Sequence, residues 1–273
     1  MPGRPFAGDI RLVVADMDGT LLDSRGAVPD SLWPVLDALR SSGVYFAVAS
    51  GRQYPTLRKY FEPSPEGIAY VAENGAYVVR DGKEVSSSPL SYEAARKAAL
   101  DIRGLAGTCD LGAVWCARET AYIERADRRF VREVEAFYKS LKVVPDLVGV
   151  HDEAIKIAIF DFGRAETESA PVLRAMSEPQ KLVVSTPHWL DIMDPSADKG
   201  VALRSLQKAL GVTPDQTVVF GDYLNDLDMM SVARHSFAMA NAHPEVIRQA
   251  EFTAPSNDDE GVVTVLRGLV GAG

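Results

Sequence analysis

Residues 13–22 constrain the fold of this chain more than any other segment, because an apolar run there ends abruptly in Asp16, Asp18 and Gly19. The run predicts a buried parallel strand, and open α/β sheets bind their ligands at the carboxyl ends of such strands. Two carboxylates one residue apart at that edge can face the same crevice. One can attack or hold a metal, and the other can transfer a proton. Burying both without a cation is costly, so the pair predicts a metal ion or a lysine beside it.

The two ends of the chain share a pattern of apolar strands that alternate with helices. Strands are predicted at residues 10–15, 44–49, 69–72, 217–220 and 237–239. Helices are predicted at residues 29–42, 199–210, 226–233, 245–250 and 261–268. Asp198 and Gly211 suit the two ends of helix 199–210, and Asp81-Gly82 predicts a hairpin turn. The alternation favours an α/β fold with a doubly wound, mainly parallel sheet.

The middle of the chain, residues 89–193, has a different pattern. Short strands come in pairs between single helices. The strands are predicted at residues 113–116, 120–124, 154–160, 181–185 and 189–193, and the helices at 91–105, 127–140 and 165–176. Pro89 and Pro195 bracket the segment, which suits two crossings between domains. We therefore expect an inserted α+β domain with a largely antiparallel sheet.

Composition excludes some classes of protein. The chain has 273 residues and a formal net charge of -9, and no long run of Lys or Arg offsets that charge, which argues against a nucleic-acid partner. Cys109 and Cys116 are not spaced as a CxxC pair, so we expect two free thiols and a reducing compartment. Residues 1–9 lack the apolar centre of a signal peptide, and no segment reaches the length of a membrane span. We expect a cytoplasmic protein with no membrane partner.

Reactive side chains follow predicted strands or begin a predicted helix at four places far apart in the sequence. They are Asp16 and Asp18, then Ser50, then Lys199, and finally Asp222, Asn225 and Asp226. A doubly wound sheet would bring these places to one edge. Phosphoryl transfer needs mainly positioning and neutralisation of charge, and Mg²⁺ prefers hard oxygen ligands. Carboxylates and the backbone carbonyl of Asp18 can supply such oxygens, while a hydroxyl and an ammonium can contact the phosphoryl group.

Each motif also has an ordinary structural interpretation. The Asp-x-Asp-Gly run can be an Asx turn at a strand end. The Ser50-Gly51 pair can be a helix cap and a turn, and Asp198 can cap a helix that begins with a solvated lysine. The acidic group after residue 221 is harder to explain in this way, because it places several polar side chains where a buried strand meets a helix. The four motifs in this order favour chemistry over four coincidences.

The motif set resembles the haloacid dehalogenase-like (HAD) hydrolase superfamily and, more closely, its Cof-type subclass IIB phosphatases. The four superfamily motifs correspond to residues 16–21, 49–52, 198–200 and 221–226. Residues 73–76, 156–159, 238–242 and 257–262 support the subclass. The resemblance implies a Rossmann-like HAD core of residues 1–88 and 194–273, with residues 89–193 as an inserted cap that determines substrate specificity. Tyr223 and Ala240 depart from a common asparagine and glycine, and neither change removes a reactive group.

The resemblance also implies a role for each site residue. Asp16 would be the nucleophile that forms an aspartyl-phosphate, and Asp18 the general acid and base. Phosphate and substrate contacts would come from Ser50, Gly51, Arg52, Asn74 and Lys199. Mg²⁺ would be held by Asp16, by the carbonyl of Asp18 and by Asp222, with Asn225 and Asp226 supporting it. Cap residues Trp115, Arg118, His188 and Trp189 are candidate substrate contacts, with packing inside the cap sheet as the alternative interpretation.

The sequence therefore predicts a Mg²⁺-dependent phosphatase that acts on small phosphorylated metabolites, with a sugar phosphate as the leading candidate. The cap would exclude water and recognise the leaving group. A phosphomutase, or a dedicated phosphatase for mannosyl-phosphoglycerate or sucrose phosphate, is the alternative among enzymes. A non-catalytic phosphate-binding regulator ranks lower, because both Asp16 and Asp18 are present. We expect a monomer or a weak homodimer.

Overall fold

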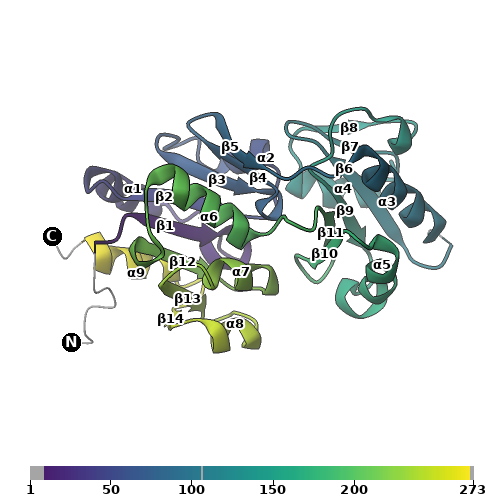
Figure 1. Cartoon of the computed structure of the whole chain (residues 1–273). Coiled ribbons are helices and arrows are strands. Elements are labelled where there is room, and N and C mark those ends of the chain that lie inside the picture. The colour runs from purple at the N-terminus through teal and green to yellow at the C-terminus, as the bar shows by residue number, and fades with distance from the viewer. Residues whose placement is uncertain (1–8, 106, 271–273) are drawn as a thin grey trace.

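Two β-sheets organise the chain, for which the computed structural model describes residues 9–105 and 107–270 (Figure 1). The larger sheet has the order β14-β13-β12-β1-β2-β3-β4-β5. Its strands are β1 (Leu12–Asp16), β2 (Tyr45–Ala49), β3 (Ile68–Ala72), β4 (Tyr77–Arg80), β5 (Lys83–Ser87), β12 (Thr217–Gly221), β13 (His235–Met239) and β14 (Phe252–Ala254). Neighbouring strands are parallel except at β4 and β5, which turn back as an antiparallel hairpin. The predicted doubly wound, mainly parallel sheet is confirmed.

Local sequence explains the key elements of this core. β1 lies between β2 and β12, and all five of its residues are buried, so its apolar run does not alternate with polar residues. The helices are α1 (Leu32–Ser41), α2 (Tyr54–Tyr60), α6 (Lys199–Leu210), α7 (Leu227–Met230), α8 (Pro244–Gln249) and α9 (Gly261–Val270). Helix α6 begins after Asp198, whose carboxylate accepts a hydrogen bond from the Val201 amide at 2.7 Å. It ends at Gly211, which has a φ of +65°. Both predicted caps are confirmed.

The second sheet belongs to the inserted domain, called the cap below. Its order is β10-β11-β9-β6-β7-β8, and every pair is antiparallel except β7 and β8. The strands are β6 (Leu111–Cys116), β7 (Ala121–Ile123), β8 (Leu141–Val143), β9 (Lys156–Asp161), β10 (Lys181–Val184) and β11 (Trp189–Met193), and the helices are α3 (Tyr92–Leu105), α4 (Arg128–Phe137) and α5 (Ala170–Ser177). Figure 1 shows this sheet and its helices as a second lobe beside the core. The predicted α+β insertion is confirmed.

Both faces of the cap sheet are covered. Along β6, Ala113 and Trp115 pack in one hydrophobic cluster together with residues of α3 and α5. The alternate residues Val114 and Cys116 pack in another cluster with residues of α4. Because successive strand residues point to opposite faces, α4 covers the face opposite α3 and α5. This places α4 where its C-terminal end can reach the core.

The structure also departs from the predicted elements. Helix α2 and strands β8 and β14 were not predicted, since α2 has only seven residues and each of the two strands has only three, at a sheet edge. The predicted helix 165–176 begins as a π-helical turn (Ala165–Ser169) before α5. The predicted domain boundaries at 88/89 and 193/194 fall in the connections between the two sheets, and they stay a prediction as boundaries.

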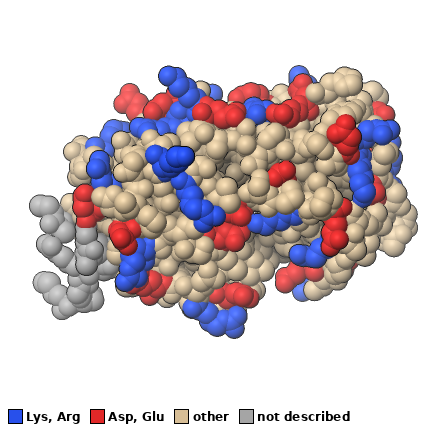
Figure 2. All heavy atoms as spheres, in the orientation of Figure 1, with Lys and Arg blue, Asp and Glu red and all other residues tan. Residues whose placement is uncertain are grey.

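Other expectations concern the surface and the cysteines. Charged side chains of both signs are interspersed over the face seen in Figure 2, so the net negative charge does not gather there in one acidic patch. Cys109 and Cys116 are free, as predicted. Within the described part of the chain, no helix has the length and apolarity needed to cross a membrane.

Candidate active site

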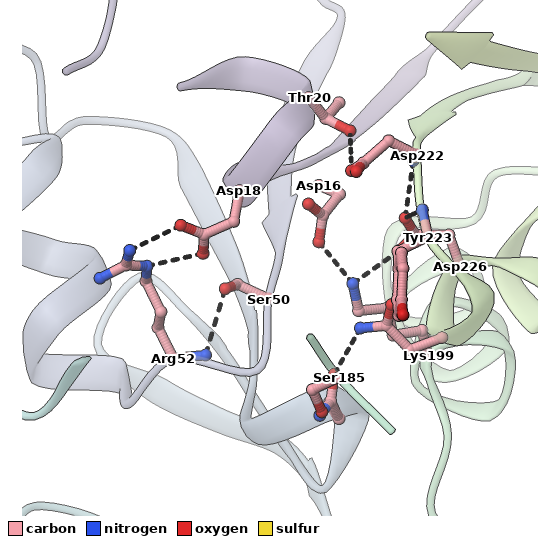
Figure 3. Close-up of polar contacts among 12 residues, drawn as sticks. Asp16, Asp18, Thr20, Ser50, Arg52, Ser185, Lys199, Asp222, Tyr223 and Asp226 are labelled. Carbon is pink, nitrogen blue, oxygen red and sulfur yellow. Dashed lines mark hydrogen bonds and ion pairs between the residues drawn. The ribbon is translucent and has the colours of Figure 1, made fainter. Parts of the chain in front are cut away.

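Four loops that are far apart in the sequence meet at the carboxyl edge of the core sheet (Figure 3). Asp16 is the last residue of β1, and Ser50 directly follows β2. Asp222 directly follows β12, and Lys199 is the first residue of α6. Because β1 pairs in parallel with both β2 and β12, their carboxyl ends lie side by side. The predicted convergence of these side chains is thus what the structure shows.

Lys199 is the cation of this centre. Its side chain is fully buried, and Nζ donates to Asp16 Oδ1 at 2.5 Å and to Asp226 Oδ1 at 2.7 Å. Burial lowers the pKa of Lys199, but the carboxylates of Asp16 and Asp226 outweigh that effect and hold the pKa above its ordinary value. The ammonium therefore stays charged and fixes one oxygen of Asp16.

Three carboxylates form a cluster near that ammonium, and two of them contact it. Oxygens of Asp16, Asp222 and Asp226 all lie within 4.8 Å of one another. Burial, opposed by Lys199 and reinforced by the other two acids, raises the pKa of Asp16 well above its usual range. Burial and the neighbouring Asp226 raise the pKa of Asp222 to about 7. One ammonium leaves negative charge in excess among these three acids, so the cluster favours a further cation.

The neighbours of the cluster orient its oxygens. Thr20 Oγ1 donates to Asp222 Oδ1 at 2.7 Å. Asp226 Oδ2 accepts from the amides of Asp222 at 2.9 Å and Tyr223 at 3.1 Å. A Cβ built on Gly19 would lie only 2.4 Å from Asp222 Oδ2, so the missing side chain makes room for that carboxylate. An all-oxygen, anionic and pre-oriented donor set fits a hard divalent cation such as Mg²⁺.

Asp18 lies apart from the acidic cluster and faces Arg52. Arg52 donates to both carboxylate oxygens of Asp18, from Nε at 2.7 Å and from Nη2 at 2.6 Å. Its Nη1 donates to the carbonyl of Ala136 in α4 at 2.8 Å, and the guanidinium lies 4.4 Å from the ring centre of Phe137. Arg52, predicted as a substrate contact, here connects the predicted acid/base to the cap.

The remaining predicted site residues lie in the loops after β2, β3 and β12. Ser50 is buried, and its Oγ accepts from the Arg52 amide at 3.1 Å. A Cβ on Gly51 would lie 3.1 Å from Asn74 Nδ2, so the two loops are in close contact. Asn74 Nδ2 donates to Ser185 Oγ of the cap at 2.6 Å, and Asn74 Oδ1 accepts from Asn225 Nδ2 at 2.9 Å. Asn74 therefore hydrogen-bonds both to Asn225 and to the cap in this structure.

A cavity lies between the core edge and the cap. Its lining from the core consists of Asp16, Asp18, Ser50, Gly51, Arg52, Asp222, Tyr223 and Asn225. The lining from the other side consists of Phe137, Tyr138, Lys156, Ser185, Thr186, Pro187, Trp189 and Asp191. The cavity thus joins the acidic cluster to a wall of aromatic and polar side chains.

The cap candidates named from the sequence have different positions. Trp189 lines the cavity. Trp115 is buried and donates from Nε1 to the Asp152 carbonyl at 2.9 Å. Arg118 forms ion pairs with Glu84 of the core, at 3.1 Å, and with Glu153 of the cap. The centre of the His188 ring lies 5.7 Å from that of the Phe160 ring. Trp115 and His188 therefore pack within the cap, as the alternative interpretation has it, whereas Arg118 forms ion pairs with both the core and the cap.

Seven cap residues that line the cavity were not predicted as site residues, among them Phe137, Lys156, Ser185 and Asp191. Lys156 offered one signal in the sequence, because it places a charge directly before a run of apolar strand residues. Asp191 offered a similar one in the middle of β11. Phe137 and Ser185 carried no such signal, because an aromatic at a helix end and a serine in a turn are ordinary there.

The chain is similar to a known protein family and to named proteins along most of its length. A family model described as haloacid dehalogenase-like hydrolase matches residues 13–266. The 5-amino-6-(5-phospho-D-ribitylamino)uracil phosphatase of Escherichia coli (strain K12) is 32% identical over 263 residues, covering 94% of this chain and 95% of that protein. A putative phosphatase of Bacillus subtilis (strain 168) is 27% identical over 271 residues, covering 95% and 98% of the two chains.

Solved structures resemble the whole chain. SMU.1108c from Streptococcus mutans UA159 superposes with a TM-score of 0.86 at 27% identity, covering 96% of this chain and 99% of that one. The HAD subclass IIB sugar phosphatase BT4131 superposes with a TM-score of 0.81 at 18% identity, covering 95% and 98%. At that lower identity the second likeness shows the fold alone. Both cover the core and the inserted domain together.

Proposed function

The chain belongs to the haloacid dehalogenase-like hydrolase family and is an enzyme that hydrolyses phosphate esters; on this premise, we propose that it does so with Mg²⁺ and through an aspartyl-phosphate at Asp16. The observation that carries the proposal is the buried Lys199 ammonium, which is shared between Asp16 and Asp226 inside a cluster of three carboxylates at the cavity. This arrangement holds one Asp16 oxygen in place beside positive charge, as attack on a phosphoryl group requires.

The proposed first step forms one bond and breaks another. Asp16 Oδ1 accepts from Lys199, so Oδ2 is the oxygen that bonds to phosphorus while the bond from phosphorus to the leaving oxygen breaks. Asp18 gives a proton to that leaving oxygen. Ser50 and Lys199 contact the phosphoryl oxygens and hold them during transfer. When bound, Mg²⁺ would neutralise charge on the phosphoryl group, held by Asp16, Asp222 and the Asp18 carbonyl with Asn225 and Asp226 in support.

The second step releases phosphate. Water bonds to phosphorus, Asp18 takes a proton from that water, and the bond between phosphorus and Asp16 breaks. The carboxylate of Asp16 returns to its starting state, paired with Lys199. The cap lowers access of bulk water to the cavity during the first step, because residues from both domains line it.

We propose phosphorylated sugars and sugar alcohols as the substrate class. The cavity is lined by polar groups such as Ser185 and Thr186 beside the aromatic Trp189, which suits a hydroxylated leaving group. The named relative from Escherichia coli acts on a phosphorylated ribityl compound, which is also a hydroxylated chain with a terminal phosphate. A cytoplasmic location and a monomeric or weakly dimeric state remain predictions.

A substrate panel tests the proposal. Phosphorylated sugars, sugar alcohols and nucleotides are assayed with Mg²⁺ for phosphate release, and the specificity constant is compared across them. Turnover that requires Mg²⁺ and is highest for a sugar or sugar-alcohol phosphate supports the proposal, whereas activity that is unchanged by chelation contradicts the metal. A phosphomutase would instead return a phosphorylated isomer with no net release. The family match shows a hydrolase, which removes the non-catalytic alternative.

A further inference from the structure

A buried lysine of the cap reaches into the core behind the cavity. Lys156, at the start of β9, is 1% exposed. Its Nζ donates to the Gly51 carbonyl at 2.7 Å and forms ion pairs with Glu73 Oε2 and Asp191 Oδ1, both at 2.9 Å. Gly51 and Glu73 belong to the core, and Asp191 belongs to the cap. The ammonium thus makes one hydrogen bond and two ion pairs, and two of these three partners, Gly51 and Glu73, lie across the domain interface.

The contact with Gly51 fixes the loop that carries the predicted phosphate contact. Lys156 holds the carbonyl of the Gly51–Arg52 peptide, and Ser50 Oγ accepts from the amide of the same peptide at 3.1 Å. Both polar ends of that peptide are therefore held. Its orientation sets the direction of the Ser50 hydroxyl on one side and of Arg52, which binds Asp18, on the other.

The Lys156–Asp191 pair also reaches the acidic loop after β12. Asp191 Oδ2 accepts from Ser185 Oγ at 2.5 Å and from Asn74 Nδ2, and Asn74 in turn accepts from Asn225. Glu73 and Asn74 have positive φ angles of 51° and 55°. Two consecutive non-glycine residues in that region are strained, so their conformation depends on surrounding contacts. Several of those contacts come from the cap.

The energetic cost of burying Lys156, Glu73 and Asp191 indicates that this cluster positions the cap and the core relative to each other rather than stabilising the fold. Burying an ammonium and two carboxylates costs desolvation energy, and apolar packing of similar volume would stabilise an interface at least as well. The cluster gives instead a defined register between cap and core. We propose that Lys156 is a positioning residue that holds the Ser50–Arg52 loop in its reactive geometry when the cap is docked; this inference rests on the proposed phosphatase function.

A pair of variants that differ only at residue 156 tests the proposal. Glu73→Gln leaves Lys156 with Gly51 and Asp191, so the loop stays held. Adding Lys156→Met removes every donor while the formal net charge of the cluster stays equal to that of the wild type. With Mg²⁺ and an aryl phosphate, we expect kcat of the double variant to fall about tenfold or more below that of Glu73→Gln. Orthovanadate, a phosphate mimic, should bind about tenfold more weakly.

Amide hydrogen exchange gives a readout that does not depend on turnover. In the double variant, exchange at residues 50–53 should be faster than in Glu73→Gln, while exchange in β1 stays unchanged. Lys181→Met is the matched control, since Lys181 of the cap also pairs with core acids, at 3.3 Å to Asp198 and 3.4 Å to Asp228. It should leave vanadate affinity and exchange at residues 50–53 within about twofold of wild type.

The outcomes separate this proposal from the proposed function. If the wild type releases no phosphate from any ester, the proposed function fails, and vanadate binding and exchange still decide the role of Lys156. The positioning role is overturned if the Glu73→Gln variant and the double variant with Lys156→Met show equal exchange at residues 50–53, equal vanadate affinity and equal kcat. If the double variant with Lys156→Met does not fold, Lys156→Arg is tested in its place. Arginine keeps the buried positive charge but replaces the compact ammonium with a larger planar group. That protein must show faster exchange at residues 50–53, and wild-type exchange would overturn the proposal.

Discussion

Replacing Gly19 with alanine should disable the acidic cluster without unfolding the protein. Gly19 has a φ of +79°, and an added Cβ would lie 2.4 Å from Asp222 Oδ2. Ordinary van der Waals contact begins about 1 Å farther out, so the carboxylate must retreat by roughly 1 Å. The hydrogen bond from Thr20 to the same carboxylate, 2.7 Å long, opposes that movement.

Two energies follow from this geometry. An alanine at positive φ costs about 1–2 kcal/mol of folding stability, which most folded domains tolerate. A shift of roughly 1 Å at a reacting centre costs about 100-fold in turnover, and misplacing a metal ligand costs about 10- to 100-fold in metal affinity. The variant Gly19→Ala should therefore fold, bind Mg²⁺ weakly and turn over slowly.

Gly26 supplies a matched control. Its φ is +76°, and a Cβ there would meet nothing within 4 Å. Gly26→Ala thus carries the same backbone strain without the clash, and its stability loss should be no larger than that of Gly19→Ala. Mg²⁺ affinity is measured by calorimetry, and kcat with an aryl phosphate. If Gly19→Ala keeps Mg²⁺ affinity and kcat within about twofold of Gly26→Ala, the assignment of Asp222 to the metal is wrong.

Three further predictions concern acids of the site and its surroundings. Asp16→Asn should abolish phosphate release with the fold intact, because an amide does not attack phosphorus; steady-state assays and circular dichroism check this. Asp18→Ala should slow esters with poor leaving groups by about 100-fold or more, and should slow the first step of activated aryl esters much less. Burial, opposed by Lys156, raises the pKa of Glu73 to about 7 from an ordinary 4.5. The folded protein therefore holds a proton that the unfolded chain loses at lower pH, so this group costs stability as pH rises from about 4.5 to about 7. The stability of Glu73→Gln relative to wild type should rise by about 3 kcal/mol across that window, as urea denaturation would measure.

The predictions for Asp16, Asp18 and Glu73 can each be contradicted by a specific result. Turnover by Asp16→Asn at the wild-type rate rejects the nucleophile. Equal slowing of the first step for activated and unactivated esters in Asp18→Ala, or no slowing of turnover at all, rejects the acid/base role. A stability difference between Glu73→Gln and wild type that is constant with pH shows that Glu73 does not titrate in that window.

Local signals explain what could be predicted from the sequence. β1 was predictable because it is buried on both faces and ends in charged residues, and α6 because Asp198 and Gly211 mark its two ends. The convergence of Asp16 and Asp222 followed from the rule that parallel strands share one carboxyl edge. In each case the information lies within a few residues or in a general rule of topology.

The partners across the domain interface could not be predicted in this way. Arg52 was expected to meet substrate, and the structure pairs it with Asp18 and the Ala136 carbonyl. The contact of Lys156 with Gly51 joins residues 105 positions apart and depends on how the cap docks. The periodicity and spacing of residues do not predict this docking, because it results from the packing of the cap against the core.

Trapping the covalent intermediate would show which residue is the nucleophile. Asp18→Ala is mixed with Mg²⁺ and an aryl phosphate whose leaving group needs no proton, so the first step proceeds and the second is slow. Borohydride then reduces an acyl-phosphate to an alcohol, and mass spectrometry locates the change. We expect homoserine at position 16. Turnover with an unmodified Asp16, or with the reduced residue elsewhere in the chain, would contradict this expectation.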